Sequence, residues 1–157
     1  MEVFLGGQKS AQAEEGGGAR AMAGPLLKNN PPGGVRLVVS DLNRLYRSRP
    51  ALHARDCEAE GFEWVLVDAA GDSVFAWVRR APGAAPIVVI SHFTPLLRHG
   101  YRMRLPSGGR WREDLNSDAS EYCGSGAGDM GIVTADEEGW AHVTIPPFGT
   151  LMLELDY

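Results

Sequence analysis

The feature that most constrains the fold of this chain is an alternation of apolar and polar side chains, which recurs from Gly61 to the C-terminus. Residues 101–105 (YRMRL) and 151–155 (LMLEL) show it most clearly. Successive side chains of a β-strand point to opposite faces, so the pattern predicts strands with one face in a core. Such stretches occur at residues 62–67, 74–80, 87–90, 101–105, 110–115, 141–145 and 151–155. About seven or eight short strands separated by turns are typical of an antiparallel β-sandwich or barrel.

One of these stretches breaks the alternation. Residues 87–90 (IVVI) form an unbroken apolar run of strand length, which predicts a central strand covered on both faces. The composition agrees with a turn-rich β fold, because 20 glycines and 10 prolines are many for 157 residues. The fold class we expect is therefore mainly β, an antiparallel β-sandwich.

A single amphipathic helix is predicted ahead of the strands. Its apolar residues fall roughly on one helical face and need a partner surface. Gly33 and Gly34 precede the helix, and Pro50 stops it, because proline lacks a backbone donor and restricts the preceding residue. The apolar residues of the predicted face are Val35, Leu37, Val38, Val39, Leu42, Leu45 and Tyr46. Before them, residues 1–32 contain few large apolar side chains and are predicted to be a flexible segment.

Charge and cysteine content exclude several classes of function. A net charge of −5 leaves no basic excess for phosphates, so we expect no nucleic-acid partner. No apolar run approaches the roughly 20 residues that cross a bilayer, and MEVFLGGQKS lacks a signal-peptide pattern, so we expect no membrane partner and a cytoplasmic location. Cys57 and Cys123 are expected to be free thiols. His53 and Cys57 are four residues apart, but no second ligand pair accompanies them, so no metal site is expected.

The stretch from Asp41 to Trp64, DLNRLYRSRPALHARDCEAEGFEW, joins the helix to the first strand. It resembles the junction between the catalytic barrel and the C-terminal all-β domain of bacterial 1,4-α-glucan (glycogen) branching enzymes, which are members of the α-amylase superfamily. The residues that match in order and spacing are Asp41, Leu42, Asn43, Leu45, Tyr46, Arg47, Pro50, Ala51, Leu52, His53, Gly61, Phe62, Glu63 and Trp64.

The resemblance extends on both sides of this junction. PIVVISHFTP, RWREDLNSDASEYCGSG and IPPFGTLMLEL look like later strands and loops of the family's β-domain, with His92 in place of the usual asparagine. VFLGGQ looks like the end of the eighth barrel strand, but the match fails after Gly7 and resumes near Leu26. A local frameshift or a decayed gene fragment would explain that break.

The resemblance implies three segments: residues 1–32 as a divergent remnant of the barrel end, 33–49 as the last barrel-type helix, and 50–157 as the all-β domain. The parent activity it implies cleaves an α-1,4 glucan and reattaches the piece as an α-1,6 branch. Glycoside transfer of this kind needs paired carboxylates. The family carries them in barrel motifs that precede this region, and none of those motifs is present. We therefore expect no catalytic residues, no cofactor and a chain inactive on its own.

The tryptophans are the remaining candidates for function, since their faces stack on sugar rings. Trp64, Trp77 and Trp111 lie in strand patterns, which favours core packing. Trp140 follows Gly139 in a turn and is the one expected to be exposed. Trp64 and Trp140 are the candidate glucan contacts, with a place at the barrel interface as the alternative for Trp64. GSGAG at 124–128 lacks the lysine of a phosphate loop and is predicted to be a flexible turn.

Three functions stay open at this point. The chain can be the C-terminal all-β portion of a branching enzyme whose catalytic barrel is encoded elsewhere. It can be a stand-alone glucan-binding module, or a structural remnant without a ligand. The expected partners are a weakly bound α-glucan and such a barrel. An exposed aromatic platform favours binding, whereas buried tryptophans with an exposed apolar helix face favour a remnant.

Overall fold

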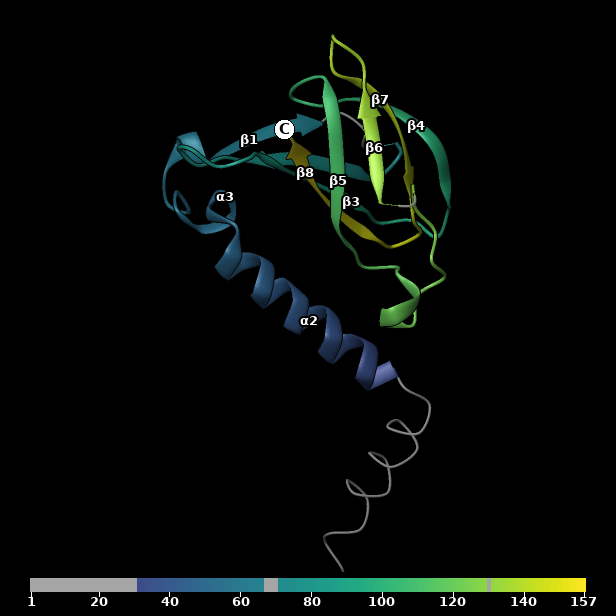
Figure 1. Cartoon of the computed structure of the whole chain (residues 1–157). Helices are drawn as coiled ribbons and strands as arrows, with labels where there is room; N and C mark the ends of the chain where they lie inside the picture. Colours follow the sequence, from purple (N-terminus) through teal and green to yellow (C-terminus); the bar gives the residue numbers. More distant parts are fainter. Residues whose placement is uncertain (1–30, 67–70, 130) are drawn as a thin grey trace, which may run out of the picture.

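The computed structural model describes residues 31–66, 71–129 and 131–157, and the expectations for residues 1–30 lie outside this range. Helices α2 and α3 precede a β-domain of eight strands in the described residues (Figure 1). The elements are α2 (Pro31–Ser48), α3 (Pro50–His53), η1 (Ala59–Gly61), β1 (Phe62–Leu66), β2 (Val74–Arg79), β3 (Ile87–His92), β4 (Arg98–Arg104), β5 (Gly109–Asn116), η2 (Ser120–Tyr122), β6 (Ile132–Ala135), β7 (Trp140–Ile145) and β8 (Thr150–Asp156).

The strands form two antiparallel sheets. The larger sheet has the order β1-β2-β3-β8-β5-β6, and the smaller one pairs β4 with β7. Apolar side chains from both sheets meet in one buried core, which confirms the predicted antiparallel β-sandwich. The core residues are Val74, Ala76, Val78, Val88, Ile90, Met103, Leu105, Trp111, Val133, Ala135, Ala141, Val143, Ile145, Leu151 and Leu153.

Strand β3 is covered on both faces, as its unbroken apolar run predicts. All six of its residues are buried, and it lies between β2 and β8. Val88 and Ile90 face the main core, while Ile87 and Val89 pack with Ala51 of α3 in a second, smaller cluster. The helical segment therefore covers the outer face of the larger sheet at its centre.

Strand β6 was not among the predicted strands. It pairs with β5 at the edge of the larger sheet, and only Val133 and Ala135 of its four residues are buried. Ile132 and Val133 are both apolar, so the segment does not show the alternation that indicates a strand. Pairing with β5 therefore decides that this segment is a strand.

Helix α2 begins earlier than predicted and includes Gly33 and Gly34. Glycine is needed at position 34, because a Cβ there would lie 2.2 Å from the backbone oxygen of Tyr122. The helix ends at Ser48, as Pro50 predicts, but Pro50 then opens the short helix α3. Proline suits the first helical position, where its missing N–H would have no partner.

No helix in the described ranges is both long and apolar enough to cross a membrane. Cys57 and Cys123 both lie at the surface and are not joined in a disulfide.

Candidate functional site

Helix α2 carries two apolar stripes rather than the single face that the sequence predicts. The inner stripe, which turns toward the β-domain, consists of Gly34, Val38, Asp41 and Leu45, spaced by three or four residues. Gly34 and Leu45 are buried. A second stripe follows the same spacing one position later and stays exposed. This outer stripe consists of Val35, Val39, Leu42 and Tyr46, whose exposed fractions are 63%, 50%, 37% and 47%.

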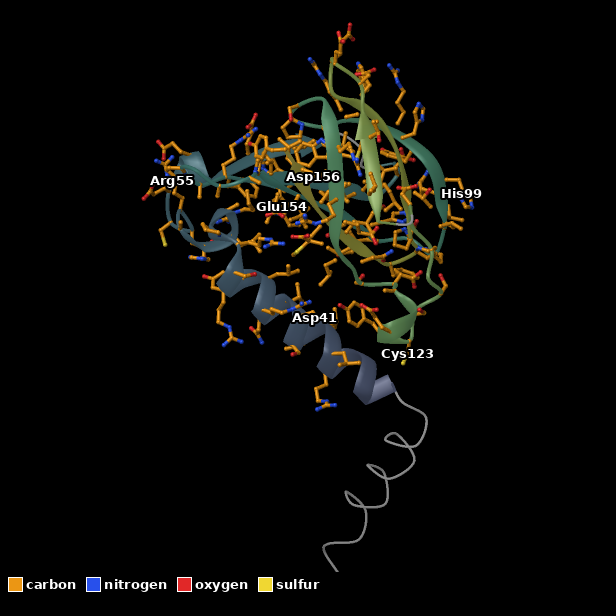
Figure 2. The ribbon with its side chains drawn as sticks, viewed as in Figure 1. Asp41, Arg55, His99, Cys123, Glu154 and Asp156 are labelled. Carbon is orange, nitrogen blue, oxygen red and sulfur yellow. The ribbon has the colours of Figure 1, made fainter. Side chains whose placement is uncertain are left out.

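Polar contacts fix the inner side of α2 to the β-domain. The hydroxyl of Tyr122 donates to Asp41 at 2.6 Å near the middle of the helix. Just after the helix, Arg49 contacts the carboxylates of Asp114 at 2.8 Å and Glu154 at 3.0 Å. Figure 2 shows Asp41 on the side of α2 that faces η2, and Glu154 between the helical segment and the larger sheet. The outer stripe is therefore presented by a docked helix.

Arg49 and a second arginine, Arg112, form one ion-pair network with Asp114 and Glu154. Arg112 pairs with both Asp114 and Glu154, so each carboxylate is shared. The hydrogen bond to Asp114 raises the pKa of Arg49, while burial first, and then the nearby Asp114, raise the pKa of Glu154. Each charge has an opposite partner, which is the arrangement of a structural ion-pair network.

A largely apolar hollow of about 350 Å³ lies beside the outer stripe, between α2 and the outer face of the larger sheet. Leu42 and Tyr46 belong to both, so the hollow continues the stripe. Its floor follows a cross-strand row, in which Trp77 is paired with Val89, and Val89 with Met152. The residues that line the hollow are Leu42, Asn43, Tyr46, Leu52, Trp77, Arg79, Val89 and Met152.

Trp64 extends this row onto the edge strand β1, opposite Trp77. It is 50% exposed and forms edge contacts with Phe62 and Trp77, at centroid distances of 5.1 and 6.2 Å. The interpretation of Trp64 as a core residue is therefore wrong. Trp64 faces outward because it pairs with the outward Trp77, and a register irregularity after it pairs Leu66 with the buried Ala76, so the two residues face opposite ways.

Trp140 is less accessible than the sequence predicts. It is only partly exposed, and the Arg102 guanidinium carbon lies 4.0 Å from the centre of its ring. This cation–π contact covers one face of the ring, which a sugar would need for stacking. The signal that could have shown this is the alternation of residues 101–105, which puts Arg102 on the outer face.

The other two tryptophans differ in burial. Trp111 is fully buried, and its indole N–H donates to the Ser107 carbonyl at 3.2 Å, so its predicted place in the core is confirmed. Trp77 is partly buried on the floor of the apolar hollow.

A second hollow, of about 280 Å³, is lined in part by Trp64. Charged groups surround it, and Arg80 is paired with Glu63 at 3.2 Å. An aromatic face beside planar charged groups provides both stacking and hydrogen bonds for a polyhydroxylated ligand. The lining residues are Glu63, Trp64, Val65, Arg80, Arg104, Leu105, Pro106 and Glu138.

The loop at 116–128, which contains the GSGAG segment predicted to be a flexible turn, is held by hydrogen bonds among its own residues. The Asp118 carboxylate accepts hydrogen bonds from the backbone N–H groups of Ser125 at 3.0 Å and Ala127 at 3.2 Å. Asn116 accepts from the Asp118 N–H at 2.9 Å and donates to the Ala127 carbonyl at 2.8 Å. These polar residues tie the loop to itself, which glycine and serine content alone does not reveal.

His92, where the resembling family usually has asparagine, makes two side-chain hydrogen bonds. Its side chain is buried; Nδ1 donates to the Pro146 carbonyl at 3.1 Å, and Nε2 accepts from the Thr94 hydroxyl at 2.6 Å. One donor and one acceptor are what an asparagine amide also offers at such a position. The role of His92 is therefore to join the β3 end to the turn before β8.

Glu113 is the one carboxylate among the described residues that is both partly buried and left with an unpartnered oxygen. Burial first, and then Asp129, raise its pKa. Its Oε2 lies beneath Gly128 of the loop at 116–128. Glu113 lines neither the apolar hollow nor the second hollow. Within the described residues, no group of three or more His, Cys, Asp and Glu side chains could hold a metal ion.

Comparison with known proteins agrees with this fold. Residues 64–156 match the family described as the alpha amylase, C-terminal all-beta domain. The 1,4-alpha-glucan branching enzyme GlgB of Novosphingobium aromaticivorans is 56% identical over 155 residues, which cover 99% of this chain and 21% of that enzyme. The enzyme of the same name from Mesorhizobium japonicum is also 56% identical, over 98% of this chain and 21% of its own length. That of Pseudomonas putida is 45% identical over 82% of this chain.

The chain thus spans about a fifth of the length of these relatives, and the matched part is their all-β domain with the helical segment before it. The eight antiparallel strands, the buried core and this match together show that the chain belongs to the family of alpha amylase C-terminal all-beta domains.

Proposed function

We propose that this chain acts as the C-terminal domain of a 1,4-α-glucan branching enzyme, and that the outer stripe with its apolar hollow contacts the catalytic part. The observation that carries the proposal is the outer stripe itself: four apolar side chains in a row on a docked helix, all exposed. The share of the relatives' length outside the match, about four fifths, supports a large additional body as the partner.

The energetics of burial support this assignment. Covering a Val or Leu side chain is worth roughly 1.5–3 kcal/mol. Contiguous exposed apolar patches on soluble proteins are usually sites of protein interaction. Because Leu42 and Tyr46 belong to both the stripe and the hollow, one partner surface can cover both. The resemblance of α2 to the last barrel-type helix, expected over residues 33–49, also favours this partner.

The reaction belongs to the complete enzyme under this proposal. Cleavage of an α-1,4 linkage and reattachment as an α-1,6 branch need an acid/base and a nucleophilic carboxylate in a sugar cleft. The described carboxylates of this chain are surface groups, partners in ion pairs or, as in Asp118 and Asp129, acceptors of backbone N–H groups, apart from Glu113 beneath the loop. The role left to the chain is to complete and stabilise the catalytic part. A cytoplasmic location, where Cys57 and Cys123 stay reduced, belongs to the proposal.

The test is a chimera of the Novosphingobium aromaticivorans enzyme in which this chain replaces the matched C-terminal residues. We expect the chimera to reduce iodine staining of amylose over time, and the chain alone to leave staining unchanged. The double variant Val39→Glu and Leu42→Glu should lower chimera activity by roughly tenfold or more, because two side chains lose burial at the contact. Ser40→Glu, an exposed position on the opposite side of α2, is the matched control and should keep full activity.

Equal activity of the chimera, the double variant and a protein truncated before α2 would contradict this function. Branching by the chain alone, scaling with its concentration, would also contradict it. Loss of activity in Ser40→Glu as well would mean that the helix tolerates no charge, and the stripe would then not be the contact.

A second candidate function, direct glucan contact, is favoured by the half-exposed Trp64 beside the polar hollow. Trp140 is the weaker candidate because Arg102 covers its ring. One tryptophan on an open surface encloses little of an oligosaccharide, so we expect a dissociation constant on the order of 1 mM. This contact would serve either the complete enzyme or a stand-alone binding module.

Thermal unfolding with maltoheptaose measures this binding. At about ten times the dissociation constant, the ligand adds roughly 1.4 kcal/mol to stability, which raises Tm by several degrees. We expect Trp64→Ala to abolish the rise and Trp140→Ala to keep it, with sucrose as the control for osmolyte effects. A rise of the same size in Trp64→Ala would remove Trp64 as the contact, and no rise in the unaltered chain would favour a structural role alone.

A further inference from the structure

We infer that the loop of residues 116–128 sets the angle at which α2 presents the outer stripe, and that Tyr122 is its positioning residue. The functional importance of this angle rests on the proposed function, in which the outer stripe contacts the catalytic part. The geometry itself comes from contacts within this chain.

Hydrogen bonds within the loop allow it to act as a reference for the helix. The Asp118 carboxylate and the Asn116 amide tie both ends of its Gly-Ser segment together, and the Gly126 N–H donates to the Asp118 carbonyl at 2.7 Å. Asn116 is the last residue of β5, so the loop is continuous with the larger sheet. Its position is therefore transmitted from the sandwich.

The short helix η2 is the part of the loop that contacts α2. Tyr122 donates its hydroxyl to Asp41 at 2.6 Å, and burial is the main cause that raises the pKa of Tyr122 above its usual range, so the hydroxyl stays a donor. The Tyr122 backbone oxygen lies so close to Gly34 that a Cβ there would be 2.2 Å away. One residue of the loop thus touches α2 at two points two turns apart, which defines a direction as well as a distance. Figure 2 shows Asp41 facing the η2 segment that ends beside Cys123.

A separate set of contacts holds the other end of the helix. Arg49 bonds to Asp114 and Glu154, and Tyr46 donates to Asp56 at 3.0 Å. Without Tyr122, the helix would keep this end and pivot about it. At 1.5 Å per residue, Val35 lies about 21 Å along the axis from Arg49, so a tilt of about 10° would move Val35 by roughly 4 Å. A displacement of that size equals a full apolar contact distance, so the stripe would no longer match a rigid partner.

Hydrogen exchange of the full chain, resolved along α2 by mass spectrometry, tests the inference without any partner. Tyr122→Phe removes only the hydroxyl. Amides of residues 36–42 should exchange at least about tenfold faster, as expected for the loss of a hydrogen bond to a charged acceptor, while those of 45–52 stay unchanged. Gly34→Ala should give the same local pattern through its clash with the Tyr122 oxygen.

Two variants serve as controls. Tyr101→Phe removes another tyrosine hydroxyl that donates to a carboxylate, Asp72 at 3.2 Å, and should leave α2 exchange unchanged. Asp41→Asn keeps an oxygen acceptor for the Tyr122 hydroxyl and should retain most of the protection. Uniformly faster exchange over the whole β-domain, or no change in Tyr122→Phe, would overturn the inference.

The chimera then separates this inference from the proposed function. Local loosening of α2 together with reduced chimera activity supports both. Tyr122→Phe could loosen α2 locally and keep full chimera activity, while the Val39→Glu and Leu42→Glu variant loses activity. That result would overturn the importance of the helix angle and leave the proposed function standing. Full activity in all of these variants would overturn the assigned contact and, with it, the reason for positioning α2.

Discussion

Replacing Leu45 by glutamate is expected to detach α2 from the β-domain and to lower the free energy of unfolding by about 3 kcal/mol or more. Leu45 is the last residue of the inner stripe and is only 6% exposed. The variant loses the burial of an aliphatic side chain and places a charge in its position, so both effects act in the same direction. Urea unfolding followed by far-ultraviolet circular dichroism measures the change.

The same substitution three residues earlier, Leu42→Glu, should leave stability nearly unchanged and reduce self-association. Leu42 belongs to the outer stripe, so stability should change by less than about 1 kcal/mol, while self-association in size-exclusion chromatography should fall. Leu45→Glu and Leu42→Glu therefore compare the buried and the exposed side of α2 with the same substitution. Equal losses of stability in both variants would show that both stripes are buried in solution, which would contradict the exposed outer stripe.

Trp111→Ala is expected to have the largest effect on the β-domain itself. The side chain is fully buried between the two sheets, and its N–H is bonded to Ser107. Truncating a buried tryptophan leaves a large cavity and costs about 3–5 kcal/mol. Small domains have only roughly 5–15 kcal/mol in total, so the variant should unfold at a Tm lower by about 10 °C or more, or fail to fold.

Trp140→Ala is the matched control for this prediction. It removes the same side chain from the outer face of the smaller sheet, where Arg102 covers it, and should cost about 1 kcal/mol or less. Tm values from differential scanning calorimetry compare the two directly. A larger loss in Trp140→Ala than in Trp111→Ala would contradict the assigned core.

Much of the β-domain could be predicted from local patterns. The alternation of residues 101–105 and 151–155 and the unbroken run at 87–90 correspond to β4, β8 and the doubly covered β3. Side-chain period reports backbone conformation directly, because adjacent residues of a strand must face opposite ways. The end of α2 was predictable for a similar reason, since proline acts on the backbone of its own residue and its neighbour.

The candidate site was less predictable, because each of its features depends on a contact between segments far apart in the chain. The register in which β1 pairs with β2 turns Trp64 outward, and an irregularity after it turns Leu66 inward, although both residues share one face in the sequence pattern. Arg102 covers Trp140 only because β4 pairs with β7. No local pattern records such pairings.

Sequence alone thus determined the class of fold, the position of most strands, the helix before them and the family, since these follow from periodicity and from short motifs. Only the tertiary structure decided which apolar residues of α2 are covered. Leu45 is buried and Val38 half-buried, while Val35, Val39 and Leu42 are exposed, although all five belong to one apolar segment. The reason is physical: Asp41 is held by Tyr122, 81 residues away, and Arg49 by Asp114, 65 residues away, and these contacts set the rotation of the helix about its axis.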